Sequence, residues 1–297
     1  MSSDNFSSCI QMSSSSPVSS DYITFTLDPT DNLTGGTTYK TRVTTGVKDA
    51  AGNALSSQYD NSTGFTTASS GTLMGGSIQG IELSLSTAVT TLAGSSSGST
   101  DATGTSASFD NPMGITTDGT NLYVADNGND RIRIIVIDNG TVTTLAGSSQ
   151  GSTDATGTSA SFNNPHGITT DGTNLYVADE SNHRIRNIVI DNGTVTTIAG
   201  QSDNGSADGI GTAASFWNPY QITTDGTNLY VVDGWNNTIR KIVISTGVVT
   251  TLAGTGSAGS ANGTGTSASF RAPRAITTDG NNLYVADGTN HRIRKIE

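Results

Sequence analysis

Charge is scarce in this sequence of 297 residues. Charged residues make up 13% of the chain, where about a quarter is usual in soluble proteins. Lys and Arg together number 14 against 25 for Asp and Glu, which gives a net charge of −11. Long-range repulsion therefore opposes binding to nucleic acid and to anionic membrane surfaces, and we expect neither class of partner.

Cysteine and long apolar runs are also nearly absent. The single cysteine, Cys9, excludes an internal disulfide, and no role for it follows from the sequence. The longest apolar runs are short strands such as 132–137, so we expect no transmembrane helix. The N-terminus lacks the basic and apolar regions of a signal peptide. The composition is nevertheless common in secreted bacterial repeat proteins, so we expect a secreted or cell-surface bacterial protein whose signal peptide is not within this chain.

What the sequence does contain is a long repeat. Its copies begin at Pro112, Pro165, Pro219 and Pro273, 53 or 54 residues apart, and the segment Pro112 to Gly147 returns almost unchanged. A fixed period of this length, with several short strand patterns in each copy, is typical of stacked supersecondary units.

Each copy predicts four strands, which in the first copy are 114–117, 122–125, 131–136 and 142–145. An Asp-Gly pair between alternating strands indicates a hairpin. A four-strand meander repeated radially is a propeller blade, so we predict an all-β fold, a β-propeller of four-stranded blades. One phenylalanine per connector is expected to fill the wedge between blades: Phe109, Phe162, Phe216 and Phe270.

The repeat resembles the NHL repeat. In the second copy the resemblance is carried by Asn164-Pro165, Gly167-Ile168, 174–179 and 182–186. It extends over residues 78–297 and implies a β-propeller, usually six-bladed, that serves as an interaction platform.

The segment before the repeats has a different pattern. Residues 33–39, 46–55 and 65–67 resemble the C-terminal half of a bacterial Ig-like domain of the S-layer type, and three strands are predicted at 22–27, 37–44 and 64–67. The predicted organisation is as follows: a polar Ser-rich segment at 1–20, a partial Ig-like domain at 21–67, a linker at 68–77 and the propeller at 78–297.

The number of blades has two interpretations. Residues 89–94 repeat 142–147, so 78–94 is the back half of a blade, while the last copy stops after its third strand at Ile296. Either the first outer strand completes the last blade in a four-bladed ring, or the chain is an incomplete ring from a longer propeller. We prefer the second interpretation.

An aspartate closes the second strand of every copy: Asp126, Asp179, Asp233 and Asp287. A ring of carboxylates would suggest cation binding. We instead expect these side chains to accept backbone N–H groups in the following turn and to pair with the arginine that opens the third strand. Those arginines are Arg131, Arg184 and Arg292, and Thr238 replaces them in the third copy.

The sequence predicts no metal or other cofactor and no catalytic residue. His183 and His291 occupy the same repeat position in different blades, and His166 lies elsewhere, so the histidines do not form a zinc set. One acidic residue per connector is too few for calcium, and we expect a solvated loop there: Asp101, Asp154 and Asp208.

The residue after each repeat proline varies on a nearly constant background: Met113, His166, Tyr220 and Arg274. In a propeller one such residue from each blade converges near the mouth of the central channel, so this position is our candidate binding site. Unconstrained variation is the alternative. Trp217 and Trp235 occur only in the third copy, where they suit stacking on a sugar or peptide, or an extension of the Phe216 wedge.

Three functions remain. The first is an extracellular interaction or scaffold module that binds a protein or glycan through the propeller rim or channel mouth, and it is our prediction. The second is a propeller enzyme, a metal-assisted lyase or hydrolase, which would need His, Asp or Glu converging at the channel. The third is a purely structural repeat. We predict that the protein is not an enzyme.

Overall fold

The computed structural model describes residues 38–39, 42–43, 59–60, 65–66 and 88–297. The chain forms two compact units, 1–72 with 81–84, and 73–80 with 85–297. In the first unit, β1 (Thr38–Tyr39) pairs with β4 (Phe65–Thr66) and β2 (Arg42–Val43) pairs with β3 (Tyr59–Asp60). β1 and β2 fall within the predicted strand 37–44 and β4 within 64–67, whereas β3 lies in none of the predicted strands. Cys9, the predicted strand 22–27 and the linker lie outside the described residues.

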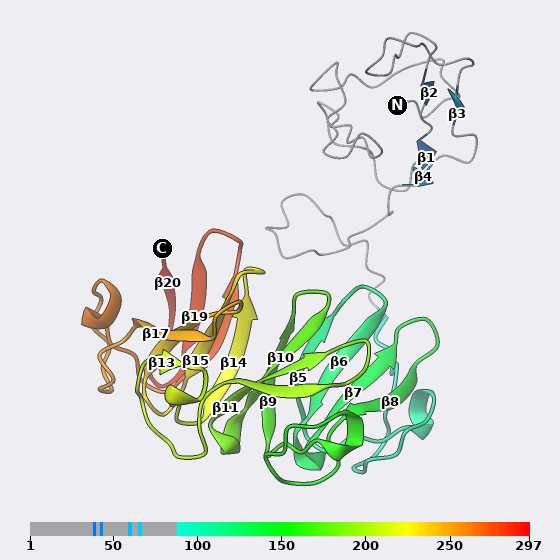
Figure 1. Ribbon diagram of the computed structural model, residues 1–297, viewed down its shortest axis with the longest axis horizontal. Helices are drawn as coiled ribbons and strands as arrows, with labels where there is room; N and C mark the ends of the chain where they lie inside the picture. Colours follow the sequence, from blue (N-terminus) through cyan, green and yellow to red (C-terminus); the bar gives the residue numbers. More distant parts are fainter. Residues whose placement is uncertain (1–37, 40–41, 44–58, 61–64, 67–87) are drawn as a thin grey trace. The chain divides into compact units, whose positions relative to one another are not determined.

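The second unit is a propeller of four antiparallel blades, as predicted (Figure 1). Blade 1 contains β5 (Pro112–Thr117), β6 (Asn121–Asp126), β7 (Arg131–Val136) and β8 (Thr141–Ala146). Blade 2 contains β9 (Pro165–Thr170), β10 (Asn174–Asp179), β11 (Arg184–Val189) and β12 (Val195–Ala199). Blade 3 contains β14 (Pro219–Thr224), β15 (Asn228–Asp233), β16 (Thr238–Val243) and β17 (Val248–Ala253), with the connector strand β13 (Gly209–Ile210) added beside β17. Blade 4 contains β18 (Pro273–Thr278), β19 (Leu283–Asp287) and β20 (Arg292–Ile296).

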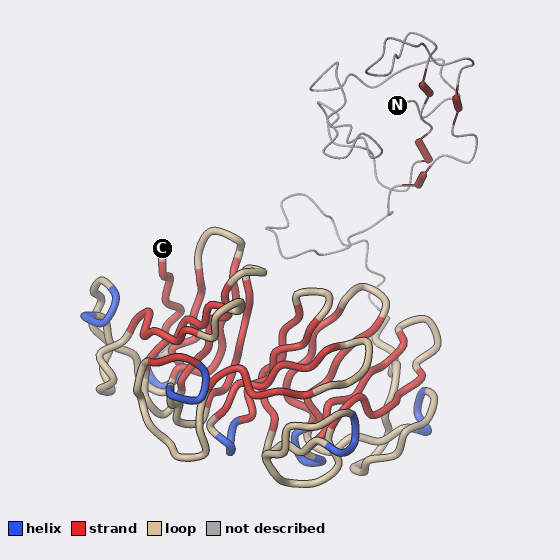
Figure 2. The backbone as a smooth tube through the Cα atoms, in the orientation of Figure 1, coloured by secondary structure: helices blue, strands red, loops and turns tan. Residues whose placement is uncertain are grey.

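The loops contain short 3₁₀ helices (Figure 2). Four lie in the connectors: η1 (Gly104–Ser106), η3 (Gly157–Ser159), η5 (Gly211–Ala213) and η6 (Gly265–Ser267). Three lie in the turn after the second strand of a blade: η2 (Asn127–Asn129), η4 (Glu180–Asn182) and η7 (Gly288–Asn290). No helix in the described part of the chain is long and apolar enough to cross a membrane.

The Asp-Gly turn fixes the first hairpin of each blade. In blade 1, Asp118 Oδ1 accepts the backbone N–H groups of Thr120 and Asn121, and Gly119 adopts φ 90°. The Tyr123 hydroxyl donates to Asp118 Oδ2 at 2.7 Å. A side chain of the second strand therefore holds the turn that precedes it, and the same contacts recur in blades 2, 3 and 4.

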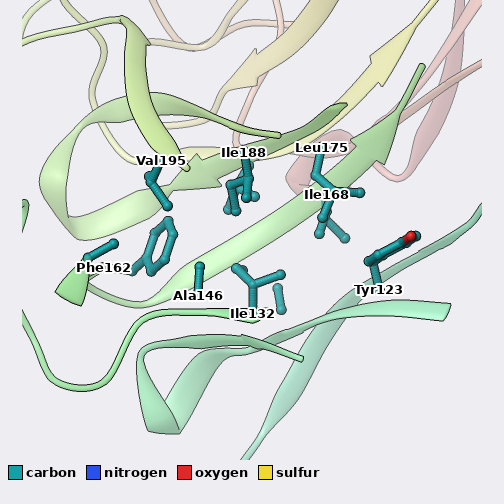
Figure 3. Close-up of a cluster of buried hydrophobic side chains, with 11 residues drawn as sticks. Tyr123, Ile132, Ala146, Phe162, Ile168, Leu175, Ile188 and Val195 are labelled. Carbon is teal, nitrogen blue, oxygen red and sulfur yellow. The ribbon is translucent and has the colours of Figure 1, made fainter. Parts of the chain in front are cut away.

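The core lies between blades (Figure 3). The cluster between blades 1 and 2 joins Tyr123 and Ile132 of blade 1 to Ile168 and Leu175 of blade 2, with Phe162 of the connector fully buried among them. Phe216 and Phe270 are 0% and 2% exposed at the equivalent places. The predicted wedge role of these phenylalanines is confirmed, and the connector is part of the core.

The predicted ion pair with Arg131 is wrong. Asp126 Oδ2 accepts from Arg133 Nη1 at 2.7 Å, whereas Arg131 donates to the Ser99 carbonyl. Arg133 lies two residues further along the same strand face, fully buried over the Phe109 ring at 5.0 Å, and there its guanidinium meets the carboxylate. The threonine at position 238 of the third copy therefore disrupts no ion pair. Every blade contains the equivalent pair: Asp126–Arg133, Asp179–Arg186, Asp233–Arg240 and Asp287–Arg294.

The acidic residues of the connectors complete this arrangement. Asp101 accepts from Arg133 Nη2 at 2.6 Å and from the backbone N–H of Thr144 at 3.0 Å. Asp154 and Asp208 have the same arginine contact in their blades. The expectation of a merely solvated loop is wrong, because each half-exposed carboxylate ties its connector to the third strand of its blade.

The blades pack in chain order. Their first strands lie side by side, β5 on β9, β9 on β14 and β14 on β18, whereas β18 and β5 do not pack in this way. Ile115 on β5 is accordingly 61% exposed, although Ile168 at the equivalent position of blade 2 is 2% exposed. Blade 1 thus exposes on this side an isoleucine that blade 2 buries.

Candidate binding face

The structure brings three of the four predicted site residues together. His166, Tyr220 and Arg274 begin the first strands of blades 2, 3 and 4, which lie next to one another. The His166 and Tyr220 rings are 5.4 Å apart between centroids, and the Arg274 guanidinium lies 5.6 Å from the Tyr220 ring centroid. Met113 is at the exposed side of blade 1, where it lines an apolar hollow with Ile115.

Two tryptophans extend this group. The Trp217 and Trp235 rings stack with centroids 5.6 Å apart and an interplanar angle of 28°. Trp235 Nε1 donates to the Tyr220 hydroxyl at 2.9 Å. Trp217 is 37% exposed and Trp235 57% exposed, whereas Phe216 is fully buried. Trp217 is therefore not an extension of the wedge, and we call these two residues with Tyr220, His166 and Arg274 the aromatic face.

A glycine makes room for the Tyr220 ring. A Cβ atom at Gly234 would lie 2.3 Å from the ring carbons Cδ2 and Cε2 of Tyr220. The equivalent position holds Asn127 in blade 1 and Glu180 in blade 2, where a ring could not lie in the same place. The glycine in the turn after β15 thus leaves the space that the tyrosine ring at the start of β14 occupies.

Polar contacts to Asn218 support the aromatic face. Glu180 Oε1 accepts from Asn218 Nδ2 at 3.0 Å, and His183 Nδ1 accepts the backbone N–H of Asn218 at 3.2 Å. Asn218 adopts φ 51°, a left-handed conformation that asparagine tolerates better than most residues. Since Asn218 lies between Trp217 and Pro219, these bonds fix the backbone from which the aromatic side chains project.

Burial shifts the imidazole of His166 toward its neutral form. Burial lowers the pKa of His166 below its usual range, the negative charge of Glu180 opposes this, and the positive charge of Arg274 adds to it. His166 Nδ1 is buried without a hydrogen-bond partner among the described residues. The aromatic face therefore presents rings and one guanidinium group.

The described residues contain no group of three or more His, Cys, Asp or Glu side chains placed to hold a metal ion. His183 and His291 each end a 3₁₀ turn in the left-handed conformation, in different blades. What the aromatic face can do chemically is to stack on an apolar or planar group and to donate hydrogen bonds through its indole and guanidinium N–H groups.

Sequence reasoning missed the residues that support this face. The turn after the second strand does distinguish the copies, reading Asn, Glu, Gly and Gly at its first position, but the sequence does not point to Glu180, Asn218 or Gly234 individually. That variation parallels the variation after the proline, and it was the available signal that the two positions touch.

Comparison with known proteins identifies the repeat. The NHL repeat profile matches residues 162–186, and the bacterial Ig-like domain profile matches residues 3–67. The matched residues 162–186 lie in the second copy, whose sequence the other copies repeat, so the blades are similar to NHL repeats. The Ig-like match begins within the Ser-rich segment 1–20 and ends where the predicted domain ends.

Curated relatives share the repeat over part of their length. NHL repeat-containing protein 2 of Bos taurus is 33% identical over 135 residues, which are 41% of this chain and 19% of that protein. The chloroplastic protein SUPPRESSOR OF QUENCHING 1 of Arabidopsis thaliana is 33% identical over 150 residues, 46% of this chain and 14% of that protein. This chain thus spans less than a fifth of the length of either relative.

Solved structures share the fold. An auxiliary nutrient binding protein from Bacteroides ovatus superposes with a TM-score of 0.53 at 24% identity, covering 64% of this chain and 49% of that one. Its counterpart from Bacteroides thetaiotaomicron gives a TM-score of 0.52 at 22% identity, covering 62% and 47%. Both likenesses concern the propeller fold alone.

Proposed function

We propose that the propeller is a non-catalytic binding module and that its ligand, a protein or a glycan, docks on the aromatic face. The observation that carries this proposal is the stacked Trp217–Trp235 pair, which is half-exposed and hydrogen-bonded to Tyr220. Large aromatic side chains are seldom left in water together without a partner. Here they are held in place by surrounding contacts, so little ordering is left for a ligand to impose.

A glycan suits the chemistry of this face best. Sugar rings offer flat apolar faces to indole rings and hydroxyl groups to N–H donors such as Arg274, and neutral sugars are not repelled by a chain of net charge −11. A protein ligand would use the same residues, because Trp, Tyr and Arg dominate the energetic centres of protein interfaces.

The test is a titration of the purified protein with a panel of neutral oligosaccharides, followed by calorimetry, for the parent chain and Trp235→Ala. We expect saturable binding that the substitution weakens at least tenfold. Ile210→Ala is the control, since Ile210 is an equally exposed apolar residue on a connector. Unchanged affinity in Trp235→Ala would remove the aromatic face as the site. Binding of a protein and of no glycan would assign the face to a protein ligand.

The non-catalytic part of the proposal rests on the carboxylates. Those closing the second strands are fully buried against arginine, and those of the first three connectors accept from the same arginines. They are engaged in holding the blades. Turnover of any glycan that binds, measured as released reducing ends, would contradict this part.

We also propose that the protein is secreted or displayed on a bacterial surface. The bacterial Ig-like match at residues 3–67 and a composition poor in charge support this location. Immunolabelling of intact cells of the producing bacterium and of its culture medium tests it, and signal confined to the lysate would contradict it.

A further inference from the structure

One hydrogen bond recurs wherever one blade meets the next, and we call it the blade brace. The residue that ends the turn after the second strand accepts, through its side chain, a backbone N–H group of the following blade. The three braces join the N–H of Asn164 to Asp130 Oδ1 at 2.8 Å, that of Asn218 to His183 Nδ1 at 3.2 Å and that of Ala272 to Asn237 Oδ1 at 2.9 Å. The role is constant while the acceptor is an aspartate, a histidine or an asparagine, and only the histidine exchanges a proton near neutral pH.

The histidine brace is the one that holds the blade with the two tryptophans. Asn218 follows Trp217 directly and precedes Pro219, the first residue of β14. Its backbone N–H is held by His183 and its side-chain amide donates to Glu180 at 3.0 Å. Both contacts come from the turn after the second strand of blade 2, so this turn fixes Asn218 from the neighbouring blade.

The position of Asn218 is coupled to both indole rings through the backbone. The Asn218 carbonyl accepts the N–H of Gly234 at 3.3 Å, and the Trp217 carbonyl accepts the N–H of Trp235 at 3.2 Å. These two bonds tie the segment that carries one tryptophan to the turn that carries the other. A displacement of Asn218 therefore reaches the backbone of both members of the stacked pair.

Protonation of His183 removes its brace. Nδ1 accepts a hydrogen bond only while it carries no proton, and in the imidazolium form both ring nitrogens are donors. The N–H of Asn218 then faces another N–H group. The charged groups that act on the ring are Glu180 of its own turn and Asp203 of the next connector, and both favour the protonated form, whereas burial lowers the pKa of His183 below its usual 6.5. The brace is therefore intact at pH 7.5 and is lost as the pH falls below about 6.5.

Two other groups near the tryptophans also titrate in acid. Asp233 Oδ1 accepts the backbone N–H of Trp217 at 2.8 Å, and burial raises the pKa of Asp233 to about 6. The His166 ring adjoins Tyr220, and burial lowers the pKa of His166. Neither group forms the brace, so a substitution at His183 separates its effect from theirs.

We propose that His183 is a positioning residue for the aromatic face and that its protonation loosens the stacked tryptophan pair, so that a ligand held there is released as the pH falls. The release of ligand rests on the proposed function, whereas the loosening of the pair concerns this chain alone. Asparagine at this position, as in the brace of blade 3, would hold the face without regard to pH. The histidine makes the face respond to acid.

Tryptophan emission tests the loosening without any ligand, because the only two tryptophans of the sequence form the pair. Between pH 7.5 and pH 5.5 we expect the emission maximum of the parent chain to move to longer wavelength as the indoles meet water. His183→Asn keeps an acceptor that does not titrate and should show the pH 7.5 spectrum at both values. His183→Gly suits the φ of 56° and has no acceptor, so at pH 7.5 it should show the spectrum that the parent chain shows at pH 5.5.

Three results would overturn the positioning role. The first is an emission maximum of the parent chain that does not change with pH. The second is a shift of equal size in His183→Asn, which would assign the effect to Asp233 or His166. The third is a parental spectrum of His183→Gly at pH 7.5.

Calorimetry with the tightest-binding neutral oligosaccharide of the panel described above tests the release. We expect about fivefold weaker binding by the parent chain at pH 5.5 than at pH 7.5, the factor that corresponds to one hydrogen bond, and equal binding by His183→Asn at the two values. Equal affinity of the parent chain at both values, with binding that still depends on Trp235, would overturn the release and leave the proposed function standing. Binding that does not depend on Trp235 would overturn the proposed function, and the emission spectra would still decide the role of His183.

Discussion

Trp235 Nε1 donates a hydrogen bond of 2.9 Å to the Tyr220 hydroxyl. The bond joins the turn after the second strand of blade 3 to the residue after its repeat proline. Both positions vary among the four copies, and in blade 3 they meet in one surface. The constant parts of the repeat build the blade, and the variable parts are brought together at one end of it.

Gly234→Ala should disrupt this surface without unfolding the blade. The new methyl group would lie 2.3 Å from the Tyr220 ring carbons, so the ring must move and its bond to Trp235 is lost. Because the sequence contains only two tryptophans and they stack on each other, we expect a shift in the tryptophan emission maximum and weaker ligand binding. The measurement is steady-state fluorescence combined with circular dichroism.

Gly288→Ala is the matched control, since Gly288 is the equivalent residue of blade 4 and a methyl group there would lie 3.0 Å from the Ala272 carbonyl oxygen and 3.4 Å from Arg274 Cγ, without meeting an aromatic ring. We expect parental tryptophan emission from this variant. Parental emission from Gly234→Ala as well would mean that Tyr220 does not occupy its place beside the turn.

Tyr220→Phe isolates the hydrogen bond from the ring. The variant keeps the ring under the Arg274 guanidinium and removes the acceptor for Trp235. We expect binding to weaken several-fold, about 1 kcal/mol, since a net contribution of that size is typical of one hydrogen bond. Calorimetric titration of the same ligand measures it. A loss as large as that of Trp235→Ala would show that the hydroxyl contacts the ligand itself.

The strands and the blade were predictable because they depend on local patterns. Period-2 alternation and the Asp-Gly turn place β5 to β8 within a residue or two of the predicted bounds. The ion pairs were not predictable from the sequence. Strand register determines which residues lie opposite each other, but it does not determine the direction in which a long side chain extends. Arg131 lies directly opposite Asp126, yet Arg133 is the arginine that lies over the Phe109 ring and reaches the carboxylate.

The candidate site was predictable in part for a similar reason. Repeat equivalence places His166, Tyr220 and Arg274 on neighbouring strands, and the structure confirms that they adjoin. Met113 is at an exposed end of the set, which depends on how the first and last blades meet. The Trp235–Tyr220 contact depends on Gly234. The sequence alone does not show that a Cβ atom at this position would collide with the Tyr220 ring.

His183 should make stability depend on pH. Burial lowers the pKa of His183 from its ordinary value of 6.5, while Glu180 and Asp203 oppose the shift. The unfolded chain then binds the proton more readily than the folded one, so the free energy of unfolding falls as the pH falls below about 6.5. Protonation of Nδ1 also removes the acceptor for the Asn218 N–H.

His183→Asn tests this with a residue that the fold already uses. Asn237 occupies the equivalent place in blade 3, with φ 52°, and its Oδ1 accepts the N–H of Ala272 at 2.9 Å. Urea unfolding at pH 7.5 and pH 5.5 should show a smaller loss of stability on acidification in the variant than in the parent chain. Equal losses in the two proteins would contradict the assignment.

Arg186→Met should cost about 3–5 kcal/mol of stability, the range found when one partner of a buried ion pair is removed. Arg186 is fully buried and donates to Asp179 at 2.7 Å and Asp154 at 2.6 Å. Its removal leaves the buried Asp179 carboxylate without its counter-charge and releases the connector from the blade. The midpoint of urea unfolding measures the change.

Lys295→Met removes the exposed pair with Glu297 and should leave the midpoint unchanged, because exposed ion pairs contribute little. A similar midpoint in both variants would mean that the buried arginine is not what holds the connector to the blade.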